Sequence, residues 1–478
     1  MRISKDEERL THRVLGDPIL MKLSTLAKEK RVPLFLVGGY LRDFFLNTPS
    51  FEPIGMDYDF TLPRQWSSFL PMMESSLQFH FFKVGKEDAG TTTYRMTRKA
   101  CSMDVTFFQG ETIEEDLQRR DFTINAIALS LLNETWHAVH RAFEDIKTRV
   151  IRTVSPKALD QDPLRMLRAI RYLCTLEGFA LDIELEREIV LKKDLIRTLP
   201  GERTKMELDR ILLSPRSGLG IRSLYELSLL LTLIPELAGL EHLGQGRHHH
   251  LRVLPHILAM MEKIHWAEEW VARNKKPLSL TPDERLILSY AALFHDLGKQ
   301  DTYSQDENGR IHFYHHESYS CKRADAIMER LRFSNAMKHR VLHLIQHHMR
   351  ILNLSSETGE SAFKRLIHQF GEDISLLVLH TLADKEASRG ILSIQMDEVI
   401  EGHCLRILQL FDEKKIIHPP PLITGHDVMA LGYSPGPKIG EILNAIREQQ
   451  IEGRIRTKEE ALKVLEERFR IFHPEKQS

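Results

Sequence analysis

The chain has 478 residues, a hydrophobic content of 42% and a formal net charge of −1. A chain of this length and apolar content can bury several hydrophobic cores, so we expect three or four domains. The near-zero net charge excludes a general electrostatic attraction to nucleic acid, and any such contact must come from local basic patches. The four cysteines are scattered without a C-x-x-C pair, which favours reduced thiols over a disulfide framework.

The sequence also bears on where the protein works. No apolar stretch approaches the roughly 18 residues of a membrane span, and the charged start MRISKDEERL is unlike a secretory signal. We therefore expect a cytoplasmic protein without a membrane partner, and the sequence identifies no stable protein partner. Of the 24 histidines, 14 lie between His242 and His348, which indicates a separate chemistry in that region.

The first informative segment is PLFLVGGYLRDFFL (33–46), which predicts a short buried strand, a Gly38-Gly39 turn and an amphipathic helix. Glycine lets the backbone approach a ligand closely, and a helix start offers free N–H groups to a phosphate. Arg42, one turn into this helix, can reach the same anion. A Gly-Gly turn alone is most often ordinary turn chemistry, so its meaning depends on the segments that follow.

The next segment, GMDYDFTL (55–62), sets two aspartates one residue apart. In a strand, alternate side chains share a face, so Asp57 and Asp59 point the same way and repel unless a cation lies between them. A lone D-x-D is more often a solvated edge strand. After a Gly-Gly turn and Arg42, however, the pair predicts a triphosphate site in which the carboxylates hold two magnesium ions.

Two further segments extend this predicted site. CSMDVTFF (101–108) reads as another strand and supplies a third carboxylate, Asp104, which we expect to tune or deprotonate the nucleophile. EEDLQRRDFTINAIAL (114–129) predicts a helix whose charged RRD run, including Arg120, precedes an apolar stretch. An ordinary charged helix entry explains the second segment equally well.

DQDPLRMLRAIRYLCTLEGF (160–179) predicts a helix with four charged residues three positions apart: Asp162, Arg165, Arg168 and Arg171. Helical spacing makes Asp162 and Arg165 neighbours. They form either a solvated ion pair, worth a few tenths of a kcal/mol, or a base-reading pair. In the second case the carboxylate accepts from an exocyclic amino group and the guanidinium donates to a ring nitrogen. Cytosine and adenine share that edge, so the pair predicts selection of C and A over U and G.

Five motifs occur in the order typical of one family: LVGGYLRD, DYDF, RRDFTINAIA, DPLRMLRAIRY with LEGFALD, and PGERTKMELDRIL. Over residues 30–240 the chain is similar to the class II tRNA nucleotidyltransferase and bacterial poly(A) polymerase family. The resemblance implies a nucleotidyltransferase head, a helical neck and body, and addition of C and A to the 3′ end of the tRNA acceptor arm. The implied substrates are CTP and ATP, and the implied cofactor is Mg²⁺.

The resemblance also assigns roles to residues. Asp57 and Asp59 match the metal carboxylates. The positions that match nucleotide-binding residues are Gly39, Arg42, Arg120, Asp162, Arg165, Arg168 and Arg171. The chain departs from the family at Gln161-Asp162, where Glu-Asp is usual, and in the long spacer LNTPSFEPIG (46–55).

A second set of motifs lies in the histidine-rich region. LRVLPHILAMMEKI (251–264) is helical in period, and AALFHDLGK (291–299) sets a His-Asp doublet in a hydrophobic helix. Burying such a doublet unpaired would cost several kcal/mol. The order H…HD…H…H…D resembles the HD phosphohydrolase superfamily over about residues 246–390.

This second resemblance implies hydrolysis of phosphate esters with a divalent metal, Mn, Ni, Co or Mg. The implied ligands of the first metal are His256, His295, Asp296 and Asp384. The candidate ligands of a second metal are His316 and His348.

Taken together, these segments predict a multidomain α+β protein. We expect an α/β head with a mixed sheet at 1–145 and an all-α neck and body that binds the base and RNA at 146–245. An all-α HD domain at 246–395 and a helical, tRNA-binding-like tail at 396–478 would follow. The consecutive prolines of HPPP (418–421) indicate a linker.

Three other functions compete with this predicted one. One is a poly(A) polymerase of the same fold, which is disfavoured because VGKEDAGTTTYRM (84–96) lacks a G-R-R-F-like run. Another is an HD nucleotide or cyclic-phosphate hydrolase whose head only binds RNA, and the third is a non-enzymatic RNA-binding scaffold. Asp57 and Asp59 oppose the last two, since binding alone would not need them. Whether CCA, CC or A is added stays open.

Overall fold

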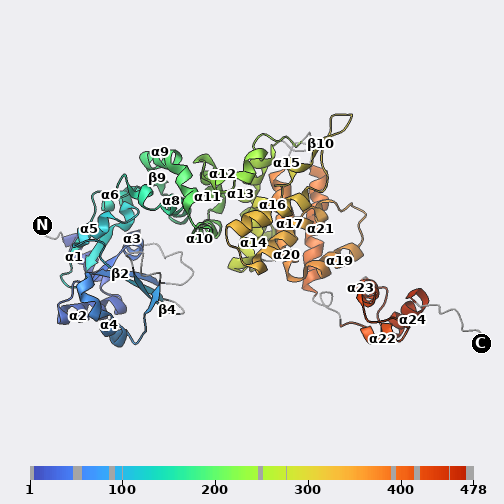
Figure 1. The fold of residues 1–478 in the computed structure, drawn as a ribbon, viewed down its shortest axis with the longest axis horizontal. Helices are drawn as coiled ribbons and strands as arrows, with labels where there is room; N and C mark the ends of the chain where they lie inside the picture. Colours follow the sequence, from blue (N-terminus) through green and yellow to red (C-terminus); the bar gives the residue numbers. More distant parts are fainter. Residues whose placement is uncertain are drawn as a thin grey trace, which may run out of the picture. The chain divides into compact units, whose positions relative to one another are not determined.

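The chain divides into two compact units, Met1–Pro235 and Glu236–Ser478 (Figure 1). The finer four-part division stays a prediction. The computed structural model describes residues 5–46, 56–84, 92–98, 101–245, 251–275, 277–388, 394–413, 420–451 and 453–469. The spacer before Asp57, the centre of the 84–96 stretch and the first half of the HPPP linker lie outside the described residues.

The first unit is built on a seven-stranded mixed sheet, as the sequence predicts. The strand order is β3-β4-β5-β2-β1-β6-β7, in which β2 and β5 are parallel and the other neighbours are antiparallel. The strands are β1 (Phe35–Val37), β2 (Met56–Leu62), β3 (Phe82–Val84), β4 (Thr93–Arg98), β5 (Cys101–Phe107), β6 (Ile127–Ser130) and β7 (Trp136–Ala138).

Buried and more exposed side chains alternate along β5, as expected for a strand with one buried face. In β5, buried Met103, Val105 and Phe107 point to one face, and Asp104 points to the other. The helices of this part are α1 (Lys5–Val14), α2 (Pro18–Lys30), α3 (Gly39–Leu46), α4 (Leu70–Leu77), α5 (Ile113–Gln118) and α6 (Ala142–Thr148). Helices α2 and α4 lie side by side against the sheet (Figure 1).

The predicted strand, turn and helix at 33–46 are confirmed by β1, Gly38 and α3. The predicted helix at 114–129 is wrong beyond its first turns. Helix α5 ends at Gln118, and the apolar stretch that follows becomes strand β6. The Asp121 carboxylate accepts from the backbone N–H of Phe122 at 2.7 Å, and this local bond competes with helix continuation.

The rest of the first unit is helical, with a two-residue parallel pair, β8 (Val150–Ile151) and β9 (Ala180–Leu181). Its helices are α7 (Ala158–Gln161), α8 (Leu164–Thr175), α9 (Ile183–Lys192), α10 (Gly201–Leu212), α11 (Ser217–Glu226) and α12 (Leu229–Leu233). Helix α8 is amphipathic and packs its apolar side against α10 and α11.

The second unit is a helical bundle around α20 (Ile374–Ala387), in which every position except Glu386 is buried. A helix buried all round belongs to the centre of a domain. Its other helices are α13 (Val253–Asn274), α14 (Pro282–Phe294), α15 (Lys299–Thr302), α16 (His316–Arg330), α17 (Asn335–His347), α18 (Met349–Leu352), α19 (Glu360–Phe370) and α21 (Ile394–Asp412). A hairpin of β10 (Tyr303–Gln305) and β11 (Ile311–Phe313), which the sequence did not predict, joins this bundle.

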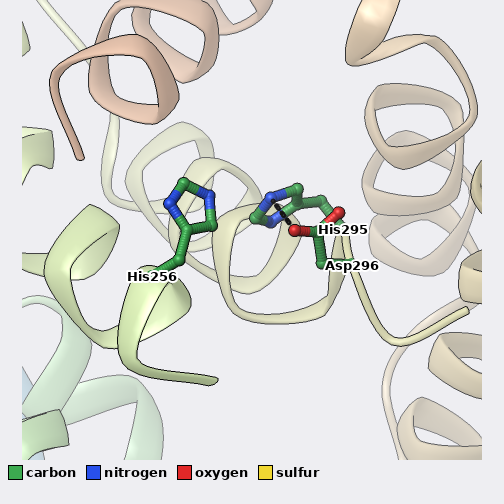
Figure 2. Close-up of side chains that lie close together, drawn as sticks. All are labelled: His256, His295 and Asp296. Atoms are coloured by element: carbon green, nitrogen blue, oxygen red, sulfur yellow. Dashed lines mark ion pairs between the residues drawn. The ribbon is translucent and has the colours of Figure 1, made fainter. Parts of the chain in front are cut away.

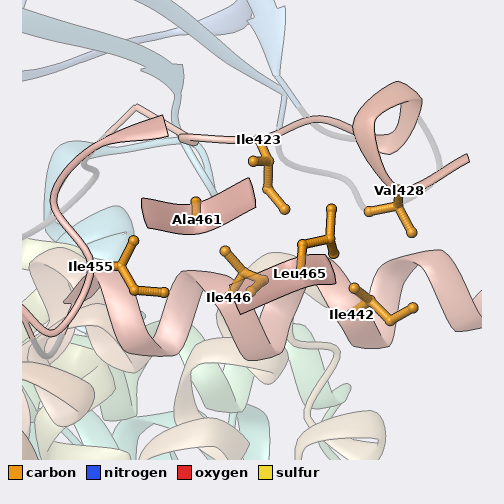
Figure 3. Close-up of a cluster of buried hydrophobic side chains, with 7 residues drawn as sticks. All are labelled: Ile423, Val428, Ile442, Ile446, Ile455, Ala461 and Leu465. Atoms are coloured by element: carbon orange, nitrogen blue, oxygen red, sulfur yellow. The ribbon is translucent and has the colours of Figure 1, made fainter. Parts of the chain in front are cut away.

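The last three helices build a small core of their own (Figure 3). They are α22 (Gly425–Met429), α23 (Pro437–Ile451) and α24 (Lys458–Phe469). The core residues all come from this segment: Ile423, Val428, Ile442, Ile446, Ile455, Ala461 and Leu465. None of the described helices is long and apolar enough to cross a membrane.

Candidate functional sites

The three predicted carboxylates of the head lie together on one face of the sheet. Asp59 on β2 is the register partner of Asp104 on parallel β5, and Asp57 stands two residues before Asp59. Strand β2 lies between β5 and β1 in the middle of the sheet, so the D-x-D is not on a solvated edge strand. The structure therefore brings Asp57, Asp59 and Asp104 together, as a metal site requires.

The carboxylates repel one another. Burial, followed by the charges of Asp57 and Asp104, raises the pKa of Asp59 from 3.8 to about 7, although Arg120 opposes the shift. Asp57, which is exposed, accepts a hydrogen bond from the Ser102 hydroxyl. A divalent cation between Asp57 and Asp59 would relieve this repulsion, so the donor set fits one.

A guanidinium that sequence reasoning missed lies beside the third carboxylate. Arg95 on β4 is the register partner of Asp104 and donates to both of its oxygens, Nε to Oδ1 at 2.7 Å and Nη2 to Oδ2 at 2.5 Å. Both Asp104 oxygens therefore have a partner already. Only the pairing of β4 with β5 identifies Arg95, and no local motif marks it.

The predicted Gly-Gly turn approaches these carboxylates closely. Gly38 has a φ of +79°, and a Cβ there would lie 3.3 Å from Asp59 Oδ2 and 3.4 Å from Arg120 Nη1. Only glycine suits such a position, because an L side chain would be strained and would crowd both charged groups. Gly39 begins α3, whose free N–H groups can receive a phosphate.

A chain of hydrogen bonds fixes the basic groups around this turn. Arg42 donates to the Asn125 amide oxygen at 2.6 Å, and the Asn125 amide nitrogen donates to Asp121 at 3.1 Å. Asp121 also pairs with Arg168, with 2.9 Å between Nε and Oδ2. Burial alone would raise the pKa of Asp121, but Arg168 and Asn125 outweigh it and lower the pKa to about 2. Sequence reasoning missed Asn125.

Asp162 and Arg165 bind other partners instead of forming an ion pair with each other, and their base-reading role stays a prediction. Asp162 does not lie in a helix, because it precedes Pro163, which disfavours helical backbone at the residue before it. Its carboxylate pairs instead with Arg203 of α10, at 3.0 Å from Nη2 to Oδ2. Arg165 donates to two backbone carbonyls, of Ala158 at 3.1 Å and of Arg119 at 2.6 Å.

Arg171, the last arginine of the predicted set, points into the helical body. Its side chain is 8% exposed and pairs with Glu207 of α10 at 2.9 Å, and the Glu207 side chain is 1% exposed. Removing one partner of a buried pair leaves an uncompensated charge. The geometry thus gives Arg171 a role in joining α8 to α10, and its nucleotide-binding role stays a prediction.

The predicted ligands of the second unit converge from separate helices. Two groups have ligand atoms within 4.8 Å of one another: His256, His295 and Asp296, and Asp296, His316 and His348. Figure 2 shows the first group, with His256 on α13 facing His295 and Asp296. Because Asp296 belongs to both groups, two cations bound there would be adjacent.

The histidines of this cluster are oriented by backbone carbonyls. In His295, His316 and His348 the ring Nδ1 lies 2.8, 2.9 and 2.7 Å from the carbonyl oxygen three residues earlier. An Nδ1–H that donates to a carbonyl leaves the lone pair on Nε2. The Nε2 atoms of His316 and His348 are 3.3 Å apart. Two lone pairs at this distance repel each other, and a cation bound by both would relieve that repulsion.

The charges of the cluster suit metal binding at Asp296 and His348, whereas burial would lower the pKa of His295 but Asp296 outweighs it and raises the pKa. Burial would raise the pKa of Asp296, but His295 and Lys299 outweigh it and hold the pKa well below its usual range. Lys299 Nζ lies 2.7 Å from Asp296 Oδ2. Burial lowers the pKa of His348 well below its ordinary value. Asp384 accepts from His256 at 3.1 Å. Ionised carboxylates and neutral imidazoles are the forms that bind metals.

Sequence reasoning missed one member of this cluster, His380. Its ring is fully buried, 5.2 Å from the His295 ring and 5.6 Å from the His348 ring. Among the described residues, neither ring nitrogen has a hydrogen-bond partner, which is costly for a buried polar group. The available signal was its spacing, one helical turn before Asp384 on α20.

The His-Asp doublet lies just after a helix rather than inside it. Helix α14 ends at Phe294, so His295 and Asp296 begin the turn that follows. A Cβ on Gly298 would lie 2.2 Å from the His316 carbonyl oxygen. Glycine at this position therefore allows the start of α16 to reach the doublet.

The raised pKa of Asp59 makes the metal-free protein sensitive to pH. Folded Asp59 holds its proton more tightly than the unfolded chain, so stability is lost as pH rises from 3.8 towards 7. With a chelator present, Asp59→Asn should raise the unfolding free energy at pH 8 by on the order of 2 kcal/mol. The gain should shrink at pH 5. Urea unfolding measures both, with exposed Asp194→Asn as control. A variant no more stable than the parent at pH 8 would contradict the repulsion.

Three family models match the chain in order. They are the poly A polymerase head domain over residues 34–152, the RNA and SrmB-binding site of polymerase A over 178–240, and tRNA nucleotidyltransferase domain 2 over 304–465. A solved CCA-adding enzyme in complex with CTP shares the fold, with a TM-score of 0.64 and 21% identity over 97% of this chain and 99% of that one.

Curated relatives resemble the chain over most of its length. An A-adding tRNA nucleotidyltransferase of Deinococcus radiodurans is 34% identical, over 73% of this chain and 78% of that protein. A CC-adding tRNA nucleotidyltransferase of Thermus thermophilus is 32% identical, over 89% of this chain and 92% of that protein. This family implies a divalent metal in catalysis. With its five motifs and its carboxylate-bearing sheet, the chain belongs to the tRNA nucleotidyltransferase family.

Proposed function

We propose that the first unit adds C, A or both from CTP and ATP to the 3′ end of tRNA, with Mg²⁺ as its divalent cation. The observation that carries this proposal is the Asp57/Asp59 pair in a central strand, with Asp104 in register beside it. The curated relatives include an A-adding enzyme, a CC-adding enzyme and multifunctional CCA proteins. Supplying CTP and ATP separately to tRNA that lacks zero, one, two or three terminal nucleotides shows whether this chain adds C, A or both.

The reaction is attack of the tRNA 3′-hydroxyl on the α-phosphate, with pyrophosphate as leaving group. Bound Mg²⁺ would lower the pKa of the attacking 3′-hydroxyl and neutralise negative charge on the triphosphate. Asp57 and Asp59 would hold it, because their carboxylates share one face of β2. The start of α3 and Arg120 lie next to Asp59 and would bind the triphosphate oxygens.

Base selection would fall to Asp162 and Arg165, each held by a different partner. Arg203 and the Leu164 N–H fix the Asp162 carboxylate, and backbone carbonyls fix the Arg165 guanidinium. Fixed groups of this kind can accept from an exocyclic amino group and donate to a ring nitrogen. This edge is common to cytosine and adenine.

The poly(A) polymerase alternative is disfavoured by the curated relatives, which are tRNA nucleotidyltransferases at 34% and 32% identity. Incorporation of CTP into tRNA would separate the two, because a poly(A) polymerase extends RNA with ATP alone. The cytoplasmic location expected from the sequence stays a prediction.

We propose a second activity for the second unit, metal-dependent hydrolysis of phosphate esters. The observation that supports it is the pair of ligand groups that share Asp296. A 2′,3′-cyclic or terminal phosphate on a damaged tRNA end would block the head, which needs a free hydroxyl. Hydrolysis by the same chain would remove that block. Mn²⁺, Ni²⁺, Co²⁺ and Mg²⁺ are the cations to test.

Replacing Asp59 by Ala should abolish nucleotide addition and leave hydrolysis of phosphate esters unchanged, because the two candidate metal sites use separate ligands. Incorporation of labelled CTP and ATP into tRNA measures the first activity, and phosphate release measures the second. Asp194→Ala, an exposed aspartate of the same unit, is the control. Incorporation within a few-fold of the parent would show that Asp59 holds no essential metal.

Replacing Arg203 by Ala should weaken base selection, since Asp162 would lose the partner that fixes it. Because this pair is partly exposed, it is worth about 0.2–1 kcal/mol, so kcat/KM for CTP or ATP should fall by up to roughly fivefold. Misincorporation of UTP and GTP should rise relative to CTP and ATP. Arg187→Ala, which removes an exposed pair with Glu184, is the matched control. A lower rate with unchanged selectivity would make the Asp162–Arg203 pair structural only.

Replacing Asp296 by Ala should abolish hydrolysis of 2′,3′-cyclic phosphates and phosphomonoesters and leave addition to intact tRNA nearly unchanged. Asp296 belongs to both ligand groups, so bound metal should be lost as well. Asp296→Asn, which keeps the side-chain volume, tests whether misfolding explains the result, and Asp325→Ala on α16 is the control. A parent protein that binds no metal and shows no turnover would make this cluster structural.

A further inference from the structure

Three histidines outside the buried cluster lie along one face of α17. His339, His343 and His347 are four residues apart, a spacing that stacks side chains on successive turns. His339 is exposed, and His343 and His347 are half-buried. They are therefore accessible from solvent, unlike the histidines of the cluster around Asp296.

The rings of two of these histidines lie close together and are steeply inclined to each other. The ring centroids of His343 and His347 are 5.0 Å apart with an interplanar angle of 79°. His316 and His348, which share a candidate metal group, show nearly the same arrangement, 5.1 Å and 72°. Two imidazoles that bind one ion at roughly 2.1 Å each also hold their centroids about 5 Å apart.

His339 does not share this arrangement. Its ring lies 6.3 Å from the His343 ring, and the two are almost parallel, at 13°. The helix thus carries one close, steeply inclined pair and one wider, nearly parallel pair with the same residue types and the same sequence spacing.

The close pair, His343 and His347, is held in place by the end of α19. The ring of Phe370 lies 4.4 Å from the His343 ring and 5.7 Å from the His347 ring. Gln369 Nε2 lies 3.0 Å from His347 Nε2. An amide donor there selects the tautomer with its lone pair on Nε2, the form that binds a metal. Packing against Phe370 therefore holds both rings in place, and the Gln369 amide leaves the lone pair of His347 on Nε2 before any ion arrives.

We propose that His343 and His347 form a transition-metal site on the surface of α17, separate from the buried cluster. Two imidazoles select Zn²⁺, Ni²⁺, Cu²⁺ or Co²⁺ over Mg²⁺ and Ca²⁺, which prefer oxygen ligands. Water completes the coordination, and the ion replaces the Gln369 amide at His347. Binding links two turns of α17 and stabilises the folded state, since the unfolded chain does not hold the pair together.

Equilibrium dialysis of the full-length chain against Ni²⁺, and electron paramagnetic resonance with Cu²⁺, count the bound ions. His343→Gln and His347→Gln should each bind one ion fewer than the parent, or bind it at least tenfold more weakly. His339→Gln, the matched control, should bind as the parent does. Saturating Ni²⁺ should raise the unfolding temperature of the parent and of the control more than that of the other two variants.

Equal ion counts in all three variants would overturn the proposal, as would loss of the ion in His339→Gln. Binding of the extra ion only at millimolar Ni²⁺ would also overturn it, because two histidines that share one ion bind it far more tightly than single surface histidines do. Circular dichroism checks that each variant is folded. If His343→Gln or His347→Gln does not fold, the remaining glutamine variant and His343→Asn decide the outcome. The test does not depend on hydrolase activity.

Discussion

The head of this protein is organised around the repulsion between two carboxylates that share one face of a central strand. Because alternate side chains of a strand share a face, Asp57 and Asp59 lie on the same side of β2. Burial adds to the repulsion and raises the pKa of Asp59 to about 7. The glycine at position 38 then lets Arg120 lie close to Asp59. The proposed metal-assisted nucleotidyl transfer would use each of these features.

The second unit also holds groups that repel one another close together, and there the groups are nitrogen lone pairs instead of charges. Backbone carbonyls hold the histidine tautomers so that Nε2 atoms face one another, 3.3 Å apart in His316 and His348. Helix ends deliver these groups: His295 follows α14, His316 begins α16 and His348 follows α17. Terminal positions allow several helices to meet at one point, so a fold made of helices can still concentrate metal ligands.

Local patterns predicted much of this. The strand, glycine and helix at 33–46 and the D-x-D strand follow from periodicity and turn chemistry, and the structure confirms them. Contacts between distant segments were not predictable: Arg95 meets Asp104 only because β4 pairs with β5. Asp162 and Arg165 do not form the ion pair that helical spacing allows, because the helix does not extend back to Asp162, whose backbone before Pro163 is extended. His380 was missed because a lone histidine on an apolar helix usually belongs to the core.

The central claim is that Asp57 and Asp59 hold divalent cations during transfer. The most direct test is a crystal structure of the full chain with CTP and Mn²⁺, in which anomalous scattering locates the metal. The account predicts a peak coordinated by Asp57, Asp59 and the triphosphate oxygens, with Gly38 beside it. A triphosphate bound by arginines alone, with no anomalous peak at these two carboxylates, would contradict it.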